Sequence, residues 1–129
     1  MNNFKKTGGK WILVGLVPML MTACGGESAV SYSQDVKPIL EKNCFECHQP
    51  GGRGEMASGL NMESHESLMK GARFGPMIIA GDPEGSNMVV LMEGRADPSI
   101  SMPHGKQQSI PKEDIETIRL WIKQGAKNN

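Results

Sequence analysis

The pentapeptide Cys-Phe-Glu-Cys-His at residues 44–48 restricts this chain more than any other stretch of its 129 residues. Two cysteines three positions apart on a helical turn present both sulfur atoms to the same side. Each sulfur can then add to one vinyl group of a haem, and the histidine that follows lies directly under the porphyrin. This C-x-x-C-H pattern is typical of c-type haem attachment. We therefore predict one covalent haem c, bound through Cys44 and Cys47, with His48 as the proximal iron ligand.

Other interpretations of the two cysteines explain less of the sequence. A structural zinc site normally uses four ligands, usually as two such pairs, and Cys24 is the only other cysteine in the chain. A thioredoxin-like redox pair needs a β-α-β context, which the hydrophobic pattern does not provide. A disulfide between Cys44 and Cys47 would leave His48 unexplained. Haem attachment uses all three residues of the motif.

The first 23 residues have the pattern of a secretory signal. Three lysines among the first ten residues precede an apolar run from Trp11 to Ala23, which is shorter than the roughly 20 residues of a membrane-spanning helix. Residues 20–26, Leu-Met-Thr-Ala-Cys-Gly-Gly, resemble the lipobox of bacterial lipoproteins, although Met21 is unusual at its position. The resemblance implies cleavage before Cys24 and lipidation of that residue. An ordinary secretory signal or an uncleaved anchor are the alternatives, and all three place the domain outside the cytoplasm.

Composition then divides the chain into a signal peptide (1–23), a small, polar, lipidated tether (24–31), one domain (32–126) and a short C-terminal tail (127–129). Three of the 14 basic residues lie in the signal, so the remainder has 11 basic and 14 acidic residues and a net charge near −3. Such a chain has no basic stripe that could neutralise phosphates. We therefore expect no nucleic-acid partner.

Helical spacing and capping residues predict an all-α fold with short helices and long loops around the haem. We expect helices from about Ser33 or Asp35 to Asn43, from His65 to Lys70, from Asp82 to Gly94 and from Lys112 to Gln124. The last of these is the clearest, because apolar residues recur on one of its faces at Ile115, Ile118, Trp121 and Ile122. The glycine-rich stretch 49–58 and the stretch 95–108 are expected to be loops.

The second axial ligand is less narrowly specified. Met102 lies in an irregular stretch between Pro98 and Pro103, and such a loop can hold a thioether rigidly against iron. His104 is the alternative ligand, whereas His65 is expected to be a solvated or capping residue. The other methionines near expected helices are most simply core residues: Met56, Met62, Met69, Met77, Met88 and Met92.

Several short segments, taken in order, resemble the planctomycete-type cytochrome c domain, a branch of the class I monohaem c-type cytochromes. They are Asp35–Leu40, Cys44–His48, Gly59–Met62, Gly81–Ser86, Met102-Pro103 and Trp121–Ala126. The resemblance implies that Met102 is the distal ligand and that the C-terminal helix crosses the N-terminal one, setting Trp121 and Ile118 against Val36 and Leu40. The family usually has a second proline where this chain has His104, which keeps that histidine open as a rival ligand or a modulator of the site.

With protein ligands on both sides of the iron, we expect electron transfer rather than catalysis. Single electrons would pass through the exposed haem edge between a redox-protein donor and acceptor, in small and weak contacts. The expected location is the periplasmic side of a bacterial membrane, anchored by lipid at Cys24. Gly25, rather than Asp, follows that cysteine and favours the outer membrane by analogy with known lipoproteins.

The alternative function is a haem sensor or a peroxidase-like enzyme with an exchangeable sixth ligand. No distal His/Arg pair stands at a recognisable spacing, and Arg53, Arg73 and Arg95 are expected to be haem-propionate partners or solvated charges. A third option is an accessory subunit whose haem serves a larger complex.

Overall fold

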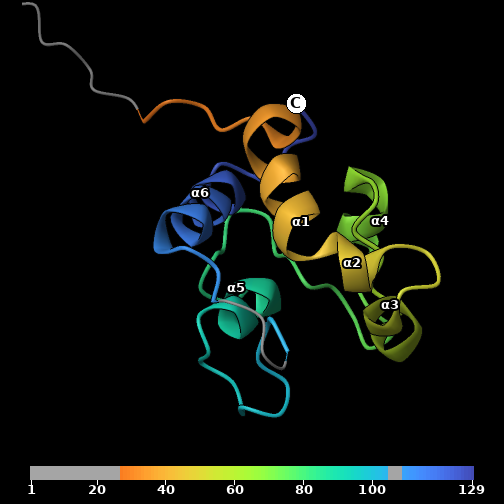
Figure 1. Ribbon diagram of the computed structural model, residues 1–129. Helices are drawn as coiled ribbons and strands as arrows, with labels where there is room; N and C mark the ends of the chain where they lie inside the picture. Colours follow the sequence, from red (N-terminus) through yellow and green to blue (C-terminus); the bar gives the residue numbers. More distant parts are fainter. Residues whose placement is uncertain (1–26, 105–108) are drawn as a thin grey trace, which may run out of the picture.

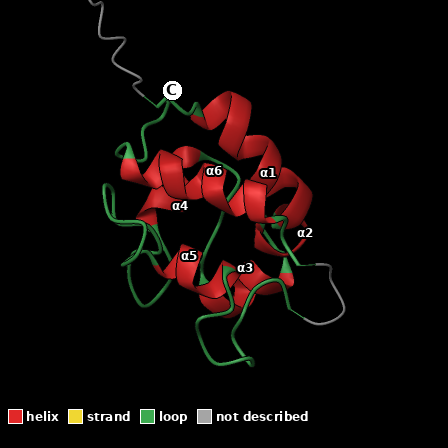
Figure 2. Ribbon diagram, turned by 90° about the vertical axis from the view of Figure 1, so that its left-hand side faces the viewer, coloured by secondary structure: helices red, strands yellow, loops and turns green. Residues whose placement is uncertain are grey.

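The computed structural model describes residues 27–104 and 109–129, and within these ranges the chain contains helices and turns but no β-strand (Figures 1 and 2). The helical elements are η1 (Tyr32–Val36), α1 (Lys37–Asn43), α2 (Phe45–His48), α3 (Arg53–Ser58), α4 (His65–Lys70), α5 (Asn87–Met92) and α6 (Lys112–Lys123). The prediction of an all-α fold is confirmed. None of the described helices has the length and apolar character needed to cross a bilayer. The expected signal peptide and the expected lipidation site, Cys24, lie outside the described residues.

The N-terminal helix begins earlier than predicted, because Ser31 rather than Ser33 or Asp35 is its cap. The Ser31 hydroxyl accepts a hydrogen bond from the Gln34 N–H (3.3 Å), and the Asp35 carboxylate accepts one from the Ser31 N–H (2.7 Å). The first turn, η1, is π-helical and runs directly into α1. Pro38 then lies in the first turn of α1, a position at which helices tolerate proline.

The C-terminal helix α6 contacts η1 and closes the hydrophobic core, as the resemblance implied (Figure 1). Val36 and Leu40 are fully buried in the same core as Ile118 and Trp121. The side chain of Tyr32 joins them, with its ring centroid 5.6 Å from that of Trp121. Short helices from both ends of the chain thus bury one continuous apolar cluster.

His65 has a structural role that the sequence did not indicate. Its Nε2 donates a hydrogen bond to the carbonyl of Ala126 (2.7 Å), and its ring packs edge-on against Tyr32 (centroids 5.0 Å apart) and Trp121 (5.9 Å). The expectation of a solvated or capping histidine was wrong, because the segment that follows α6 returns to cover α4. His65 therefore ties α4 to the C-terminal end of the domain.

The helix expected from Asp82 begins only at Asn87. The Asp82 carboxylate accepts a hydrogen bond from the Gly85 N–H (2.9 Å) and so closes a turn instead of capping a helix. The side chain of Ser86 is fully buried, donates to the carbonyl of Asp82 (2.7 Å) and accepts from the Ile79 N–H (2.9 Å). These bonds hold residues 82–86 as a turn that leads into α5.

Candidate cofactor site

A cavity of about 640 Å³ opens between α2, α3, α5 and the loops at 71–77 and 100–104. Its size falls within the roughly 300–1,000 Å³ of typical ligand sites. The cavity has two walls, which we name by their residues. The α2 wall comprises Cys44, Cys47, His48, Gly54, Leu60 and Met62, and the α5 wall comprises Met88, Leu91, Met92, Ile100, Met102 and Pro103.

Cys44 and Cys47 reach the cavity because the motif folds as one helical turn. Cys44 ends α1 and begins α2, and its carbonyl accepts hydrogen bonds from the N–H groups of Cys47 (3.1 Å) and His48 (2.9 Å). Both cysteines are half-buried free thiols. Burial, with a smaller contribution from the charge of the neighbouring Cys47, raises the pKa of the Cys44 thiol to about 12. Arg53 donates a hydrogen bond from Nε to the Cys47 sulfur (3.3 Å), a contact that its sequence position did not suggest.

His48 is fixed with one ring nitrogen available. The side chain is only 6% exposed, and Nδ1 donates a hydrogen bond to the carbonyl of Leu60 (3.1 Å). A proton on Nδ1 leaves the lone pair on Nε2, which is the arrangement that a metal-binding imidazole needs. The backbone of the same residue is held as well, because its carbonyl accepts from the Met62 N–H (2.8 Å). The ring therefore has a defined tautomer and orientation.

Gly54 allows this position of the His48 ring. A Cβ atom on Gly54 would lie 2.9 Å from both Cε1 and Nε2 of the imidazole, closer than carbon atoms pack. Gly52 is restricted in the same way, since its Cβ would lie 2.4 Å from the carbonyl oxygen of Cys47. The expectation that residues 49–58 form only loop was wrong: Arg53–Ser58 is helical, and these two glycines serve close approach rather than flexibility. The sequence signal that could have indicated this packing is the position of both glycines directly after the cysteine motif.

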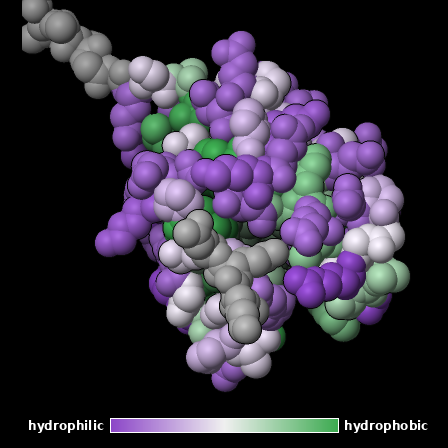
Figure 3. Space-filling model, in the orientation of Figure 1, coloured by the Kyte–Doolittle hydropathy of each residue, from purple (hydrophilic) through white to green (hydrophobic). Residues whose placement is uncertain are grey.

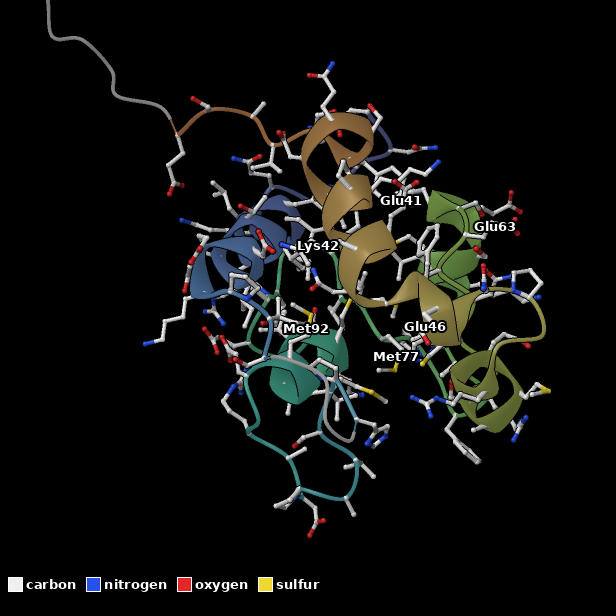
Figure 4. All side chains as sticks on the ribbon, in the orientation of Figure 1. Glu41, Lys42, Glu46, Glu63, Met77 and Met92 are labelled. Atoms are coloured by element: carbon white, nitrogen blue, oxygen red, sulfur yellow. The ribbon has the colours of Figure 1, made fainter. Side chains whose placement is uncertain are left out.

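Met102 belongs to the α5 wall, where its N–H donates to the carbonyl of Leu91 (3.1 Å) and its side chain is half-buried. Four further methionines line the cavity: Met62, Met77, Met88 and Met92. Figure 4 shows Met92 on α5 and Met77 nearer to α2, both below the end of α1. Met62, Met88 and Met92 are buried in the core as expected, whereas Met56 is 62% exposed and that expectation was wrong.

The mouth of the cavity carries exposed apolar side chains. Phe74 is 93% exposed and Ile100 is 52% exposed, and both line the opening together with the exposed His104. In Figure 3 the visible face of the molecule is mostly hydrophilic, with hydrophobic atoms gathered over α3 at the lower right. Exposed apolar groups around a cavity are typical of binding surfaces.

The arrangement fits a covalently bound haem. Two thiols and an imidazole nitrogen lie on one wall of an apolar cavity, and the thioether-bearing loop of Met102 lies on the other. Arg73, one of the proposed propionate partners, instead donates hydrogen bonds to the carbonyls of Ala57 (3.3 Å) and Met56 (3.2 Å) at the end of α3. Arg95 pairs with Glu93 (2.5 Å).

Residues 44–104 match the family model described as Planctomycete cytochrome C. The matched range begins at the first cysteine of the motif and ends at His104, so it contains all the residues that line the cavity except Asn43 and Ile110. No curated protein and no solved structure matches the chain.

Proposed function

We propose that this chain, which carries a cytochrome c domain of the planctomycete type, moves single electrons outside the cytoplasm through one haem c with His48 and Met102 as its axial ligands. A domain of this family indicates haem-based electron transfer with a covalently bound haem. The fixed His48 ring is the main support for a haem with protein ligands, because the hydrogen bond from Nδ1 to the Leu60 carbonyl leaves Nε2 available for the iron.

When bound, the haem supplies an iron that alternates between the ferrous and ferric states. Cys44 and Cys47 would hold it by thioether bonds, His48 and Met102 would be its iron ligands, and the buried side chains of the cavity would exclude water. Because these ligands would stay in place in both oxidation states, little of the chain would have to rearrange. Ligation by Met and His also raises the reduction potential of the iron relative to ligation by two histidines.

The proposed location follows from the sequence alone. We propose that the domain is secreted and anchored at the periplasmic side of a membrane by lipid at Cys24, and that it exchanges electrons with redox proteins that dock at the mouth of the cavity. The exposed Phe74 and Ile100 at that mouth support brief apolar contacts of the kind that redox pairs form.

An absorbance experiment tests the assignment. The full chain is made in a host with a haem-attachment system, and we expect one haem per chain by pyridine haemochrome, a mass increased by one porphyrin, and the far-red charge-transfer band of Met-ligated ferric haem. The Cys44→Ala/Cys47→Ala variant is the control and is expected to lose all covalent haem. Colourless wild-type protein would refute the proposal. Prompt binding of carbon monoxide by the reduced protein at neutral pH would favour the sensor or peroxidase-like alternative.

A further inference from the structure

The segment before η1 is bonded to the end of α6, although the sequence suggested a tether there. The side-chain amide of Gln124 donates from Nε2 to the carbonyl of Ser28 (3.0 Å) and accepts at Oε1 from the Val30 N–H (2.8 Å). The Gln124 amide thus makes the two hydrogen bonds to this segment that the backbone of a neighbouring β-strand would make. Lys123 also pairs with Glu27 (3.1 Å).

Asn129 makes a second bridge of the same kind. Its Oδ1 accepts from the Tyr32 N–H (2.8 Å), its Nδ2 donates to the carbonyl of Val30 (3.2 Å), and its backbone oxygen accepts from the Ser33 N–H (3.0 Å). We call residues 27–33 together with Lys123, Gln124 and Asn129 the N-terminal clamp. It fixes the chain from Glu27 onward.

The clamp and the cavity lie at different ends of the molecule. In Figures 1 and 2 the start of the described chain and the C-terminus both lie toward the top, whereas α3 and α5, which flank the cavity, lie toward the bottom. The clamp therefore determines which end of the domain a membrane anchor on the preceding residues would hold.

We infer that the clamp orients the domain on the membrane, with the C-terminal end of α6 toward the bilayer and the mouth of the cavity toward water. This inference rests on the proposed lipid at Cys24. Between Cys24 and Glu27 the chain extends about 10–11 Å at most, which is less than the radius of gyration of about 13 Å for a domain of roughly 100 residues. A free tether from Cys24 to Ser31 would reach about 25 Å and would let the domain turn over.

The redox partner is accordingly a protein whose redox site lies in the aqueous phase, and not a lipid-soluble carrier within the bilayer. A carrier confined to the bilayer would meet the α6 end, where the cavity does not open. The mouth around Phe74 and Ile100 is then free for docking from water.

The clamp itself is tested by hydrogen exchange on the lipidated holoprotein. Gln124→Ala/Asn129→Ala removes the acceptors of the Val30 and Tyr32 N–H groups, and we expect exchange of these two amides to become roughly tenfold faster, since one or two lost hydrogen bonds amount to about 1.4 kcal/mol. The control is Gln34→Ala/Asn128→Ala, because both side chains are exposed and make no hydrogen bond to a described residue. Equal exchange in all three proteins would overturn the clamp.

Orientation is tested with two one-electron oxidants of the ferrous haem. Lipidated protein in phosphatidylcholine vesicles is oxidised either by ferricyanide in the water or by a lipid bearing ferrocenium in the bilayer; each accepts one electron per haem. We expect the clamp variant to react severalfold faster than wild type with the ferrocenium lipid and at the same rate with ferricyanide. Insertion of six Gly/Ser residues between Gly26 and Glu27, which leaves the clamp intact, should have the same effect.

Equal rates with the ferrocenium lipid in wild type, clamp variant and insertion variant would overturn the inference. The mass of the N-terminal peptide separates this result from a failure of the proposed function. A peptide without lipid at Cys24 would refute the anchor and the membrane orientation together, whereas a lipidated peptide with equal rates would refute the orientation alone.

Discussion

The two walls of the cavity hold their proposed iron ligands in different ways. On the α2 wall, the buried His48 ring has a backbone acceptor at Leu60, extends from the end of a helical turn and has Gly54 next to its Cε1 and Nε2 atoms. On the α5 wall, the half-buried Met102 lies in an irregular loop, and its backbone N–H donates a hydrogen bond to the carbonyl of Leu91. Buried contacts thus preorganise the proposed proximal ligand, His48, whereas the position of the proposed distal ligand, Met102, depends on a loop.

The largest effect is expected from removing the distal thioether. Met102→Ala should abolish the far-red charge-transfer band, lower the reduction potential and open the iron to carbon monoxide, while leaving the covalent haem in place. Absorbance spectra and a redox titration measure these changes. Met77→Leu is the matched control, because this half-buried methionine also lines the cavity. If the band survives in Met102→Ala and disappears in Met77→Leu, the α5 wall supplies no ligand from its loop and the comparison fails.

An intermediate effect is expected on the α2 wall. Gly54→Ala places a methyl group 2.9 Å from two atoms of the His48 ring, and overpacking of this kind costs about 1–3 kcal/mol. The melting temperature of the holoprotein should fall by about 4–8 °C per kcal/mol. Met56→Ala, on the exposed face of the same helix, should change stability by less than about 0.5 kcal/mol. An unchanged melting temperature in Gly54→Ala would show that the ring is less confined than its contacts imply.

The smallest effect concerns the surface charges that fasten α5 to α6. Arg119 donates hydrogen bonds to Glu84, just before α5, and to Glu93, just after it (2.9 Å). The hydrogen bond from Arg119 lowers the pKa of the Glu84 carboxyl below its ordinary value of 4.5. A carboxyl that is more acidic in the folded state adds stability above its unfolded pKa, and this stability is lost as the pH falls through the folded value.

Arg119→Ala should therefore lower the melting temperature slightly at neutral pH, and the difference from wild type should shrink in acid. Because Glu84 is exposed, solvent screening keeps the effect below that of Gly54→Ala. Lys112→Ala on the same helix is the charge-matched control. A difference that is constant from neutral pH to below pH 4 would show that Arg119 acts through packing and not through its charge.

Much of the α2 wall could be predicted from the sequence, because its chemistry is local. Cys44, Cys47 and His48 lie within one helical turn, so their spacing alone brings them to one side. The periodic apolar residues of α6 likewise indicated both a helix and its buried face. By contrast, α3 was missed because Gly52 and Gly54 are turn formers in isolation. Only the folded chain shows that Gly52 lies against the carbonyl of Cys47 and Gly54 against the ring of His48.

Sequence by itself thus determined the helical class, the C-x-x-C-H motif and the apolar face of the C-terminal helix, since each depends on residues a few positions apart. The tertiary structure decided what depends on distant neighbours. It gave His65 a carbonyl partner 61 positions away, selected which methionines face the cavity, and joined Gln124 and Asn129 to the segment before η1. The reason is physical: a hydrogen bond or a cavity wall forms between groups that folding brings together, and a linear pattern does not record that approach.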